Sequence, residues 1–585
     1  MRIAPSSRRL PRARTILLRL AVNATLAGWA ASVLLVLLVF YLNSGVSLTA
    51  RNYFPLAFPI LLFYGPISGL VLTALAGVIR LFAAFRVSTP WIGFRPFWRF
   101  LVADLWLLSL LYAYNLSEAR DYLPVAMIRH LQGATFLLAG GCVLFVGGTL
   151  WSSLRRRRLR PLMAILGALL VSGTLFSIRE RYREETPPVS ASEIEPPQPR
   201  NGLLLLGIEG AAPEDVLPMV ADGRLPNFGS LLRAGSTIPL IGRQPPRLLG
   251  AWASVLTGRA PSSHGLVEGR GFSPLGSQAV FRTPPLGIGF DWLTRIGLVR
   301  LRQMRVSLDG QGVGQILQRC GYEVMAAGWG GMMDGDLVPA GQVPQERETP
   351  LPVSVTSYRD LLRRHLETAR QDGDGTPLER ALASALHDDM TSAAALWRAT
   401  RRVAAKPRAL FLRLAGLENV VRVFLRYQRP HRFGNVSDEE LERYSQVIPD
   451  YYRFLDAWLG LLAEAAGPSA RVFVVSPYGV APVGVFRRLR NAVAGTWHDS
   501  GTHRHAGPGL LLAAGPGVRV GGRLEGARLE DVLPTLLYVL DLPVGRDMQG
   551  QTLPGLASDE FARTHAVSAI PSWKTVRVVP HAALW

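Results

Sequence analysis

Acidic residues and histidines follow several short apolar runs of this chain. Glu209 comes directly after the run Leu203–Ile208, and Glu418 follows the run Leu410–Leu414 by a few residues. A carboxylate at the end of a buried strand lies at the lip of a sheet, where it can hold a cation. Further candidate metal ligands lie in the segment "WHDSGTHRH", namely His498, Asp499, His503 and His505. Such a segment forms either a metal site or a solvated loop, and we expect the loop.

These side chains need a sheet whose strands end side by side. Five apolar runs alternate with helix-length segments, at Leu203–Ile208, Tyr322–Ala327, Leu410–Leu414, Val472–Ser476 and Leu510–Ala514. This alternation predicts an α/β domain with a mostly parallel sheet and helices on both faces. Sites in such sheets form at the carboxyl ends of the strands, where Glu209, Glu418, Pro477 and Tyr478 stand. Between Arg270 and Ala409 the pattern is looser, and we expect peripheral helices and insertions.

The composition indicates a membrane protein. The chain has 585 residues, of which 49% are hydrophobic, and its mean hydropathy is +0.19, more apolar than a soluble enzyme. The net charge is +21, but many arginines flank apolar segments near the N-terminus, which argues against nucleic-acid binding. The two cysteines, Cys142 and Cys320, give no disulfide framework.

Five apolar segments are candidates for an α-helical transmembrane bundle: Leu20–Leu42, Phe54–Ile79, Leu101–Tyr114, Leu131–Trp151 and Pro161–Ile178. The first, second and fourth reach the roughly 20 residues that cross a bilayer, whereas the third and fifth are shorter. Asp104 lies in the third segment, and we expect it at a helix-packing contact or at the membrane interface.

Arginines set the expected orientation. They are abundant in the N-terminal tail, in the second connection and in "RRRRLR", and scarce in the alternate connections. The positive-inside bias predicts a cytoplasmic N-terminus and an extracytoplasmic domain after Ile178. Arg155 to Arg158 can contact acidic lipid headgroups. The expected domains are a membrane region at 1–180, a proline-rich linker at 181–200, the α/β domain at 201–560 and a tail at 561–585.

Four longer motifs occur in order over roughly 350 residues: "GRLPNFGSLLRAGS" (Gly223 to Ser236), "AWASVLTGRAPSSHG" (Ala251 to Gly265), "SGTHRHAGPGLLLAAGPGV" (Ser500 to Val518) and "LEDVLPTLLYVLDLPVGRDMQG" (Leu529 to Gly550). Through them the chain from about Gly202 to Gly555 resembles the type I phosphodiesterase / nucleotide pyrophosphatase branch of the alkaline phosphatase superfamily. The apolar prefix is similar, in architecture only, to membrane-bound phosphoethanolamine and glycerophosphate transferases of that superfamily.

The resemblance implies a site that cleaves phosphate esters with two metal ions, usually zinc, and a serine or threonine nucleophile. In the family the first ion is held by an aspartate after the first strand, by the nucleophile and by the Asp-His pair of "Ser-Asp-His-Gly". The matching positions here are Glu209, Leu248, Pro477 and Tyr478. Only Glu209 is a plausible ligand. Neither Leu248 nor its neighbours Arg247 and Leu249 can attack phosphorus.

The second ion is held in the family by an Asp-x-x-x-His motif and by the histidine of "Gly-Thr-His". This chain has Glu418 and Arg422 in "LAGLENVVRVF" and keeps His503 in "GTH". Arginine cannot bind the metal, because its guanidinium has no lone pair to give and stays charged. We therefore predict an ion-paired cluster in which Arg422 replaces the metal charge beside Glu209 and Glu418.

Three residues of the second motif have structural interpretations. Ser254 and Thr257 carry hydroxyls, but we expect them to pack and cap a helix rather than attack phosphorus. His264 in "SSHG" matches a position that looks structural in the family.

These replacements predict a membrane-anchored pseudoenzyme without a catalytic residue, in which Glu209, Glu418 and His503 are remnant metal positions. We expect no cofactor, and contacts with membrane lipids and with an envelope protein or a phosphorylated envelope ligand. The alternative is an active phosphohydrolase or phospho-group transferase that acts on envelope lipids or glycans with zinc or another divalent metal. Nucleic acid is not an expected partner.

Overall fold

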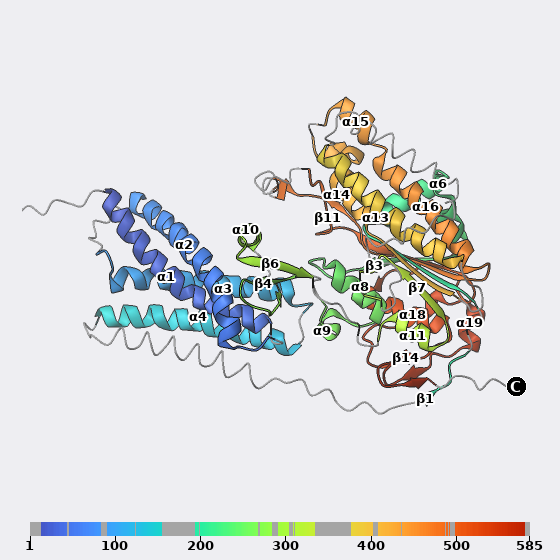
Figure 1. Cartoon of the computed structure of the whole chain (residues 1–585), viewed down its shortest axis with the longest axis horizontal. Helices are drawn as coiled ribbons and strands as arrows, with labels where there is room; N and C mark the ends of the chain where they lie inside the picture. The colour runs from blue at the N-terminus through green and yellow to red at the C-terminus, as the bar shows by residue number, and fades with distance from the viewer. Residues whose placement is uncertain are drawn as a thin grey trace, which may run out of the picture. The chain divides into compact units, whose positions relative to one another are not determined.

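The computed structural model divides the chain into two compact units (Figure 1). The first comprises Met1–Thr186 with Glu268–Met304, and the second comprises Pro187–Val267 with Arg305–Trp585. The segment Glu268–Met304 thus leaves the second unit and belongs to the first. The structure describes residues 13–43, 46–82, 90–122, 125–154, 193–197, 199, 201–266, 270–282, 290–303, 308, 311–330, 332–333, 376–401, 408–434, 436–485, 487–488, 491 and 498–578.

Four long helices form most of the first unit: α1 (Ala13–Leu42), α2 (Ala50–Phe82), α3 (Phe94–Ala119) and α4 (Val125–Leu154). Three stretches in them are long and apolar enough to cross a membrane, namely Arg14–Leu37, Ala50–Ile79 and Pro96–Ser117. The segment Leu101–Tyr114, predicted to be short, lies within the 26 residues of α3. In α4 the apolar stretch is shorter, Leu131–Val143. The predicted segment Pro161–Ile178 and Arg155 to Arg158 lie outside the described residues.

Small residues allow α1 and α2 to pack closely in opposite directions. A Cβ on Gly65 would lie 1.9 Å from the Trp29 ring, and one on Gly69 would lie 2.3 Å from Thr25 Oγ1. Close approach through small residues is a general means of helix association in membranes. A larger residue at either glycine would therefore push the two helices apart.

Asp104 lies at a helix-packing contact, one of the two places expected for it. Its side chain is buried in α3, and Ser68 of α2 donates a hydrogen bond to it. A carboxylate in an apolar helix is costly unless it faces a polar partner, and Ser68 is such a partner. The acid thus joins α2 to α3.

The segment Glu268–Met304, called the insert from here on, forms a small antiparallel sheet on these helices. Its sheet has the order β5-β4-β6, and its elements are β4 (Arg270–Pro274), β5 (Phe281–Arg282), α10 (Phe290–Arg295) and β6 (Val299–Gln303). Phe281 packs edge-on against Phe40 of α1, with ring centroids 5.4 Å apart. Ser277 donates a hydrogen bond of 3.3 Å to Asn52 of α2. The insert therefore covers the C-terminal end of α1 and the N-terminal end of α2.

A seven-stranded sheet forms the centre of the second unit, in the order β13-β3-β12-β9-β2-β8-β7. Neighbours are parallel, except that β12 runs antiparallel to β9 and β3. The predicted mostly parallel sheet is confirmed, and all five predicted runs are strands of it. Two strands were missed, because β3 contains Pro239 and β13 has two residues. The bounds are β2 (Leu203–Ile208), β3 (Gly235–Ile241), β7 (Glu323–Ala327), β8 (Arg408–Leu414), β9 (Arg471–Tyr478), β12 (Pro508–Ala514) and β13 (Ala527–Arg528).

Helices cover both faces of this sheet, as predicted (Figure 1). Side chains of β2 alternate between the faces: Leu204 and Leu206 enter one core, and Leu203 and Leu205 the other. A strand buried on both faces needs an apolar residue at every position, which explains the leucine run. One face packs on α6 (Pro213–Ala221), α7 (Pro226–Ala234), α13 (Pro377–Thr400), α14 (Gly416–Gln428) and α16 (Val447–Ala466), and the other on α8 (Leu248–Thr257), α11 (Val313–Arg319) and α18 (Val532–Val539).

The ends of the second unit differ from the expected boundaries. β1 (Glu193–Ile194), within the expected linker, pairs with β16 (Arg577–Val578), within the expected tail. Trp573 is buried, and its Nε1 donates to Pro543 O at 3.0 Å. These residues fold with the sheet domain because a side chain as large and apolar as Trp573 gains by leaving water. Shorter elements are α9 (Pro261–His264), η1 (Pro430–Arg432), α15 (Asp438–Tyr444), β10 (Ala481–Pro482), β11 (Gly501–Thr502), η2 (Leu529–Asp531), β14 (Val544–Gly545), η3 (Pro554–Leu556), α19 (Asp559–Thr564) and β15 (Ala569–Ile570).

Candidate functional site

Glu209 is buried at the end of β2, and an arginine forms an ion pair with its carboxylate. Its side chain is 3% exposed. Glu209 Oε1 accepts hydrogen bonds from Arg413 Nε and from Trp252 Nε1, both at 2.7 Å. Burial raises the pKa of the Glu209 carboxyl, while the Arg413 guanidinium opposes that rise. Glu209 and Arg413 thus form a buried ion pair, a type of contact that is costly to break from one side.

Arg413 was not among the residues that the sequence analysis singled out. It lies on β8, in register with Gly207 of β2, and its Nη1 also donates to Gly328 O at 3.1 Å. The sequence did contain a sign of this role, because Arg413 places a charge inside the otherwise apolar run of "RALFLRL". Charged residues are almost never buried without a partner, so such a position indicates a buried ion pair.

Trp252 reaches Glu209 because Gly207 has no side chain. A Cβ on Gly207 would lie 2.7 Å from the Trp252 ring and 3.3 Å from Trp329. The two tryptophans pack edge to face, with ring centroids 5.3 Å apart, and both are fully buried. Aromatic rings therefore enclose one side of Glu209 and keep water from it.

Glu418 and His503 form a second pair. His503 Nε2 lies 3.1 Å from Glu418 Oε1, and His503 Nδ1 donates to Gly479 O at 2.7 Å. Burial alone would lower the pKa of His503, but its contact with Glu418 outweighs burial and raises that pKa. Burial would raise the pKa of the Glu418 carboxyl, but His503, Glu209 and Arg422 together lower it. Both shifts favour the charged forms of the two side chains.

Arg422 does not take the predicted place beside Glu209. Its Nε lies 3.6 Å from Asp499 Oδ1, and its side chain is 47% exposed. Arg422 stands one helical turn after Glu418 on α14, where its charge helps to keep Glu418 ionised. The predicted cluster is therefore wrong in its main cation. Arg413 lies on the strand next to Glu209 and reaches it within the sheet, whereas Arg422 extends from a helix toward solvent.

The other positions predicted to replace site residues carry apolar or aromatic side chains. Leu248 is the first residue of α8 and packs against the core of that face. Pro477 and Tyr478 end β9 and are buried, and the Tyr478 ring centroid lies 6.0 Å from that of His503. A Cβ on Gly242 would lie 2.0 Å from the Tyr478 ring. The phenol ring thus fills space that Gly242 leaves, and none of the three residues supplies a carboxylate or an imidazole.

The side chains at this edge of the sheet do not fit two metal ions. Throughout the described part of the chain, no three or more His, Cys, Asp or Glu side chains are grouped so as to hold a metal ion. Glu209 is paired with Arg413, and Glu418 is paired with His503. A zinc ion would have to displace both partners and would then meet the permanent charge of Arg413.

The segment "WHDSGTHRH" is a loop whose polar side chains face different partners. His503 contacts Glu418, Asp499 contacts Arg422, and His505 is exposed. Metal ligands must converge on one point within about 2 Å of the ion. The loop interpretation fits these contacts better than a relocated metal site.

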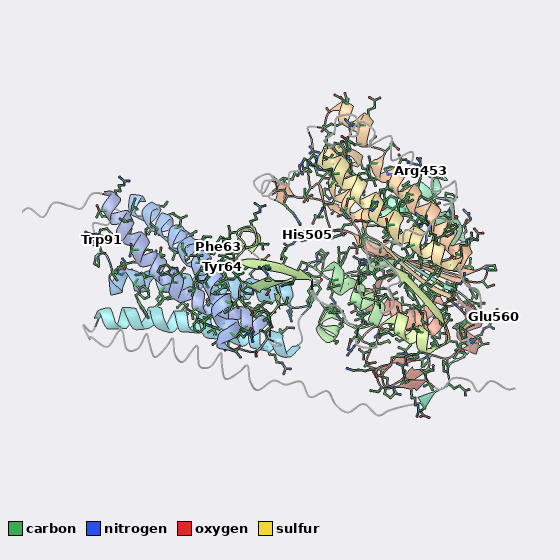
Figure 2. All side chains as sticks on the ribbon, in the orientation of Figure 1. Phe63, Tyr64, Trp91, Arg453, His505 and Glu560 are labelled. Carbon is green, nitrogen blue, oxygen red and sulfur yellow. The ribbon has the colours of Figure 1, made fainter. Side chains whose placement is uncertain are left out.

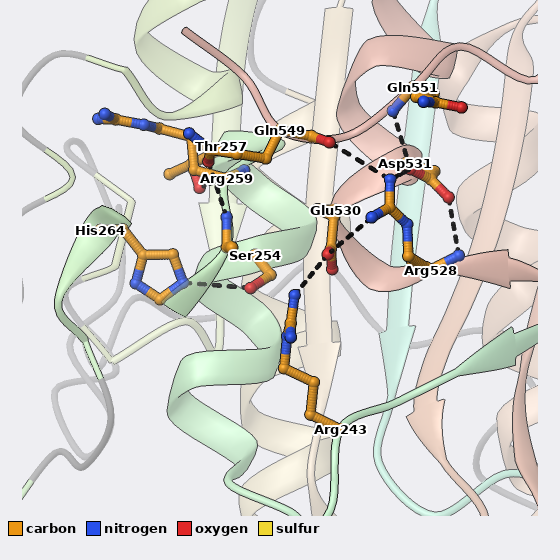
Figure 3. A network of polar contacts seen from close by, with 11 residues as sticks. Arg243, Ser254, Thr257, Arg259, His264, Arg528, Glu530, Asp531, Gln549 and Gln551 are labelled. Carbon is orange, nitrogen blue, oxygen red and sulfur yellow. Dashed lines mark hydrogen bonds and ion pairs between the residues drawn. The ribbon is translucent and has the colours of Figure 1, made fainter. Parts of the chain in front are cut away.

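Ser254, Thr257 and His264 belong to a network around α8 (Figure 3). His264 Nδ1 accepts the Leu266 N–H at 3.1 Å, so Nε2, 3.1 Å from Ser254 Oγ, carries the ring proton. A nitrogen that already holds a proton cannot take one from Ser254. Burial lowers the pKa of His264 to about 3, and Thr257 Oγ1 donates to Ala253 O at 2.6 Å. Both hydroxyls therefore have structural roles, as expected.

The same network reaches the loop that precedes α8 (Figure 3). Arg243, in the loop before α8, donates Nη2 to the buried Glu530 at 2.7 Å. Asp531, next to Glu530, accepts the Gln551 N–H at 2.8 Å. The loop that leads to Leu248 is thus tied to the segment before α18.

Asp389 of α13 holds the turn that presents Glu418. Asp389 Oδ1 accepts the N–H groups of Ala415 and Gly416, both at 3.1 Å, and Oδ2 accepts the Tyr451 hydroxyl at 2.7 Å. Burial raises the pKa of Asp389 to about 7. No motif indicated this residue, because it lies on a helix far along the chain from the turn it supports.

Replacing Arg413 should destabilise the fold far more than replacing Arg422. Arg413→Gln leaves Glu209 buried without its cation, so the free energy of unfolding should fall by about 3–5 kcal/mol. Arg422→Gln removes a half-exposed pair, and the loss should stay below about 1 kcal/mol. Urea unfolding of the detergent-solubilised chain, followed by tryptophan fluorescence, measures both. The double variant Glu209→Gln/Arg413→Gln should recover part of the loss; equal losses for Arg413→Gln and Arg422→Gln would contradict the assignment.

Asp389→Asn should change how stability depends on pH. Folding raises the Asp389 pKa from an ordinary value near 4 to about 7. The resulting stabilisation is fully present below about pH 4 and is lost as the pH rises through 7. Relative to Asp389→Asn, the unmodified chain should therefore lose up to about 4 kcal/mol over that range. Melting temperatures at several pH values test this, with Asp438→Asn on the exposed start of α15 as control; parallel curves for wild type and Asp389→Asn would count against it.

Comparisons with known proteins identify the family of the second unit. The sequence pattern that defines the type I phosphodiesterase / nucleotide pyrophosphatase family matches residues 203–536, more than half of the chain. No curated protein matches the chain significantly.

Several solved structures are similar to the chain. An inactive variant of murine ectonucleotide pyrophosphatase / phosphodiesterase 5, in complex with AMP, is 14% identical, covers 63% of this chain and 100% of its own, and has a TM-score of 0.32. The phosphonate monoester hydrolase from Silicibacter pomeroyi is 13% identical, with 60% and 76% covered and a TM-score of 0.36. Human ectonucleotide pyrophosphatase / phosphodiesterase 5 is 13% identical, with 62% of this chain and 99% of its own covered and a TM-score of 0.32. The match over residues 203–536 means that the chain belongs to the type I phosphodiesterase / nucleotide pyrophosphatase family.

Proposed function

We propose that the chain is a membrane-anchored pseudoenzyme of its family, whose phosphodiesterase-like unit binds a ligand or partner without turnover. The ion pair between Glu209 and Arg413, at 2.7 Å, is the observation that carries this proposal. A two-metal mechanism needs its first carboxylate free to bind a cation that stabilises phosphoryl oxygens. Here that carboxylate is paired with the Arg413 guanidinium. A guanidinium cannot take the part of a metal ion in the reaction.

The second metal position supports the same conclusion. Glu418 is paired with His503 at 3.1 Å, so the two side chains that match family ligands bind each other. Leu248, at the position that matches the nucleophile, has no atom that can attack phosphorus. Residues that act as one catalytic unit depend on one another. The loss of any one of them therefore removes most of the rate.

The insert supports the proposed orientation in the membrane. α1 runs from Ala13 toward the insert, and α2 runs back, as the contacts of Gly65 with Trp29 and of Gly77 with Leu17 indicate. The insert covers the end of α1 opposite to Ala13, and both of its ends continue into the second unit. If Ala13 is cytoplasmic, as the arginines indicate, the second unit is extracytoplasmic. The odd number of crossings that the sequence predicts likewise puts the chain after Ile178 on the extracytoplasmic side.

The purified chain should neither hold zinc stoichiometrically nor hydrolyse a nitrophenyl phosphodiester. Leu248→Thr should stay at the background rate, because a hydroxyl without an adjacent base or metal keeps an ordinary alcohol pKa. Elemental analysis and a colorimetric assay with added zinc or manganese make the measurement, with an active family member as positive control. Stoichiometric zinc with turnover that a chelator abolishes would overturn the pseudoenzyme proposal. It would favour the alternative, an active phosphohydrolase or phospho-group transferase acting on envelope lipids or glycans.

Cysteine labelling should place the insert and the second unit on the outer side. Cys142 and Cys320 are buried, so single cysteines at the exposed positions Leu275→Cys and Val520→Cys report their own accessibility. A membrane-impermeant maleimide should label both in intact cells, whereas a tag on the N-terminus should be reached only after permeabilisation. Labelling of either cysteine only after permeabilisation would refute the orientation.

A further inference from the structure

A short turn precedes α3 and lies against the N-terminal half of α1. It comprises residues 90–93, which we call the entry turn, and Figure 2 labels its Trp91. Asn23 of α1 donates a hydrogen bond to Trp91 O at 2.9 Å. A Cβ on Gly93 would lie 2.3 Å from the Pro90 ring, so the turn is tight enough to need a glycine at its end.

Asn23 binds the backbone of the entry turn with both atoms of its amide. Its side chain is fully buried, Nδ2 donates to Trp91 O, and Oδ1 accepts the Gly93 N–H at 2.9 Å. Nδ2 also donates to Arg19 O at 2.7 Å and to Pro90 O at 3.4 Å. Irregular backbone at membrane depth is tolerated only where the protein satisfies its polar groups, whereas a turn in water needs no such side chain. The contacts of Asn23 are those expected of a turn that lies below the membrane surface.

The position of Asn23 on α1 indicates the depth of the turn. The stretch Arg14–Leu37, which is long and apolar enough to cross a membrane, has 24 residues and is therefore roughly 36 Å long. Asn23 lies more than two helical turns after Arg14, ~13 Å along the axis of α1. The hydrocarbon core of a bilayer is about 30 Å thick. If the stretch is centred in the bilayer, Asn23 and the turn bound to it lie inside the hydrocarbon boundary.

α2 indicates the same depth. A Cβ on Gly77 would lie 3.6 Å from Leu17, so this part of α2 packs beside the first turns of α1. The apolar stretch of α2 continues beyond Gly77 to Ile79. Asn23 lies farther from the start of α1 than Leu17, and the apolar part of α2 therefore extends past the level of the entry turn.

Two apolar side chains of the entry turn are exposed. Trp91 is 50% exposed and Ile92 is 73% exposed, and Leu18 of α1, next to Arg19 in the chain, is 53% exposed. The Arg19 guanidinium carbon lies 5.3 Å from the centre of the Trp91 ring. Tryptophan is enriched where acyl chains meet headgroups, because its ring is apolar and its Nε1–H is polar, and an arginine stem can lie along apolar surface while its charge reaches the headgroups.

We propose that the entry turn is a membrane anchor, whose Trp91 and Ile92 insert among the lipids of the leaflet on the side of Ala13. Ile92 contacts the acyl chains, and Trp91 lies at their boundary with the headgroups. Asn23 is a positioning residue, because it gives the backbone of the turn the hydrogen bonds that water would otherwise supply. The inference rests on the membrane anchoring in the proposed function, and not on the absence of turnover.

The test uses the full chain in phosphatidylcholine nanodiscs, with one nitroxide spin label at a time. The buried cysteines are first replaced, as Cys142→Ala and Cys320→Ala. The labels are attached to Ile92→Cys, to Leu110→Cys within the apolar stretch of α3, and to Val520→Cys in the second unit, three exposed positions. Collision rates are measured with oxygen, which concentrates in hydrocarbon, and with a polar nickel complex, which stays in water.

We expect the label at Ile92 to collide more often with oxygen than with the nickel complex, as at Leu110 and in contrast to Val520. A water-like result at Ile92 together with a lipid-like result at Leu110 would overturn the anchor alone. Water-like results at both would overturn the membrane anchoring itself. Low collision rates with both reagents at Ile92 would also overturn the proposal, because a second copy of the chain or another protein would then cover the turn.

The variant Asn23→Ala tests the positioning role. It leaves backbone groups of the entry turn without their partner, so the turn should move toward water and the nickel collision rate at Ile92 should rise roughly twofold or more. The matched control Asn115→Ala removes another buried asparagine, whose Nδ2 bonds Leu111 O within α3, and should leave that rate unchanged. Equal changes in both variants would contradict the role of Asn23. If melting temperatures show that Asn23→Ala does not fold, the label at Ile92 in the chain with Asn23 still decides the proposal.

Discussion

A carboxylate buried at the end of a strand must be paired with a positive charge, because an isolated ion away from water is too costly for a fold to keep. In this chain Arg413 provides that charge to Glu209 from the neighbouring strand, at 2.7 Å. Gly207 makes room for Trp252, which donates a second hydrogen bond to the same oxygen. The arrangement of this edge of the sheet follows from that pair.

The other charged side chains at this edge of the sheet form local pairs. Glu418 binds His503, and Arg422 lies beside Asp499. A two-metal site holds a phosphoryl group by a concentrated positive charge. Within each of these pairs, in contrast, the positive and the negative charge largely cancel.

The membrane unit depends on a different constraint, the close approach of helices. Gly65 and Gly69 let α2 approach Trp29 and Thr25 of α1, and Ser68 satisfies Asp104 between α2 and α3. The insert adds Phe281 to the aromatic contacts at one end of α1. A segment that belongs by sequence to the second half of the chain is thus part of the core of the first unit.

Sequence alone determined the apolar helices, the mostly parallel sheet and the family, because burial on both faces of β2 requires the leucine run and bilayer crossing requires long apolar segments. It also predicted that Leu248, Arg422, Pro477 and Tyr478 stand where the family has reactive or ligating residue types. Only the tertiary structure decided which cation meets Glu209, which residue holds the turn before Glu418, and where Glu268–Met304 packs. Those choices depend on contacts between residues far apart in the chain, and a local pattern of residue types carries no information about which distant partners will meet.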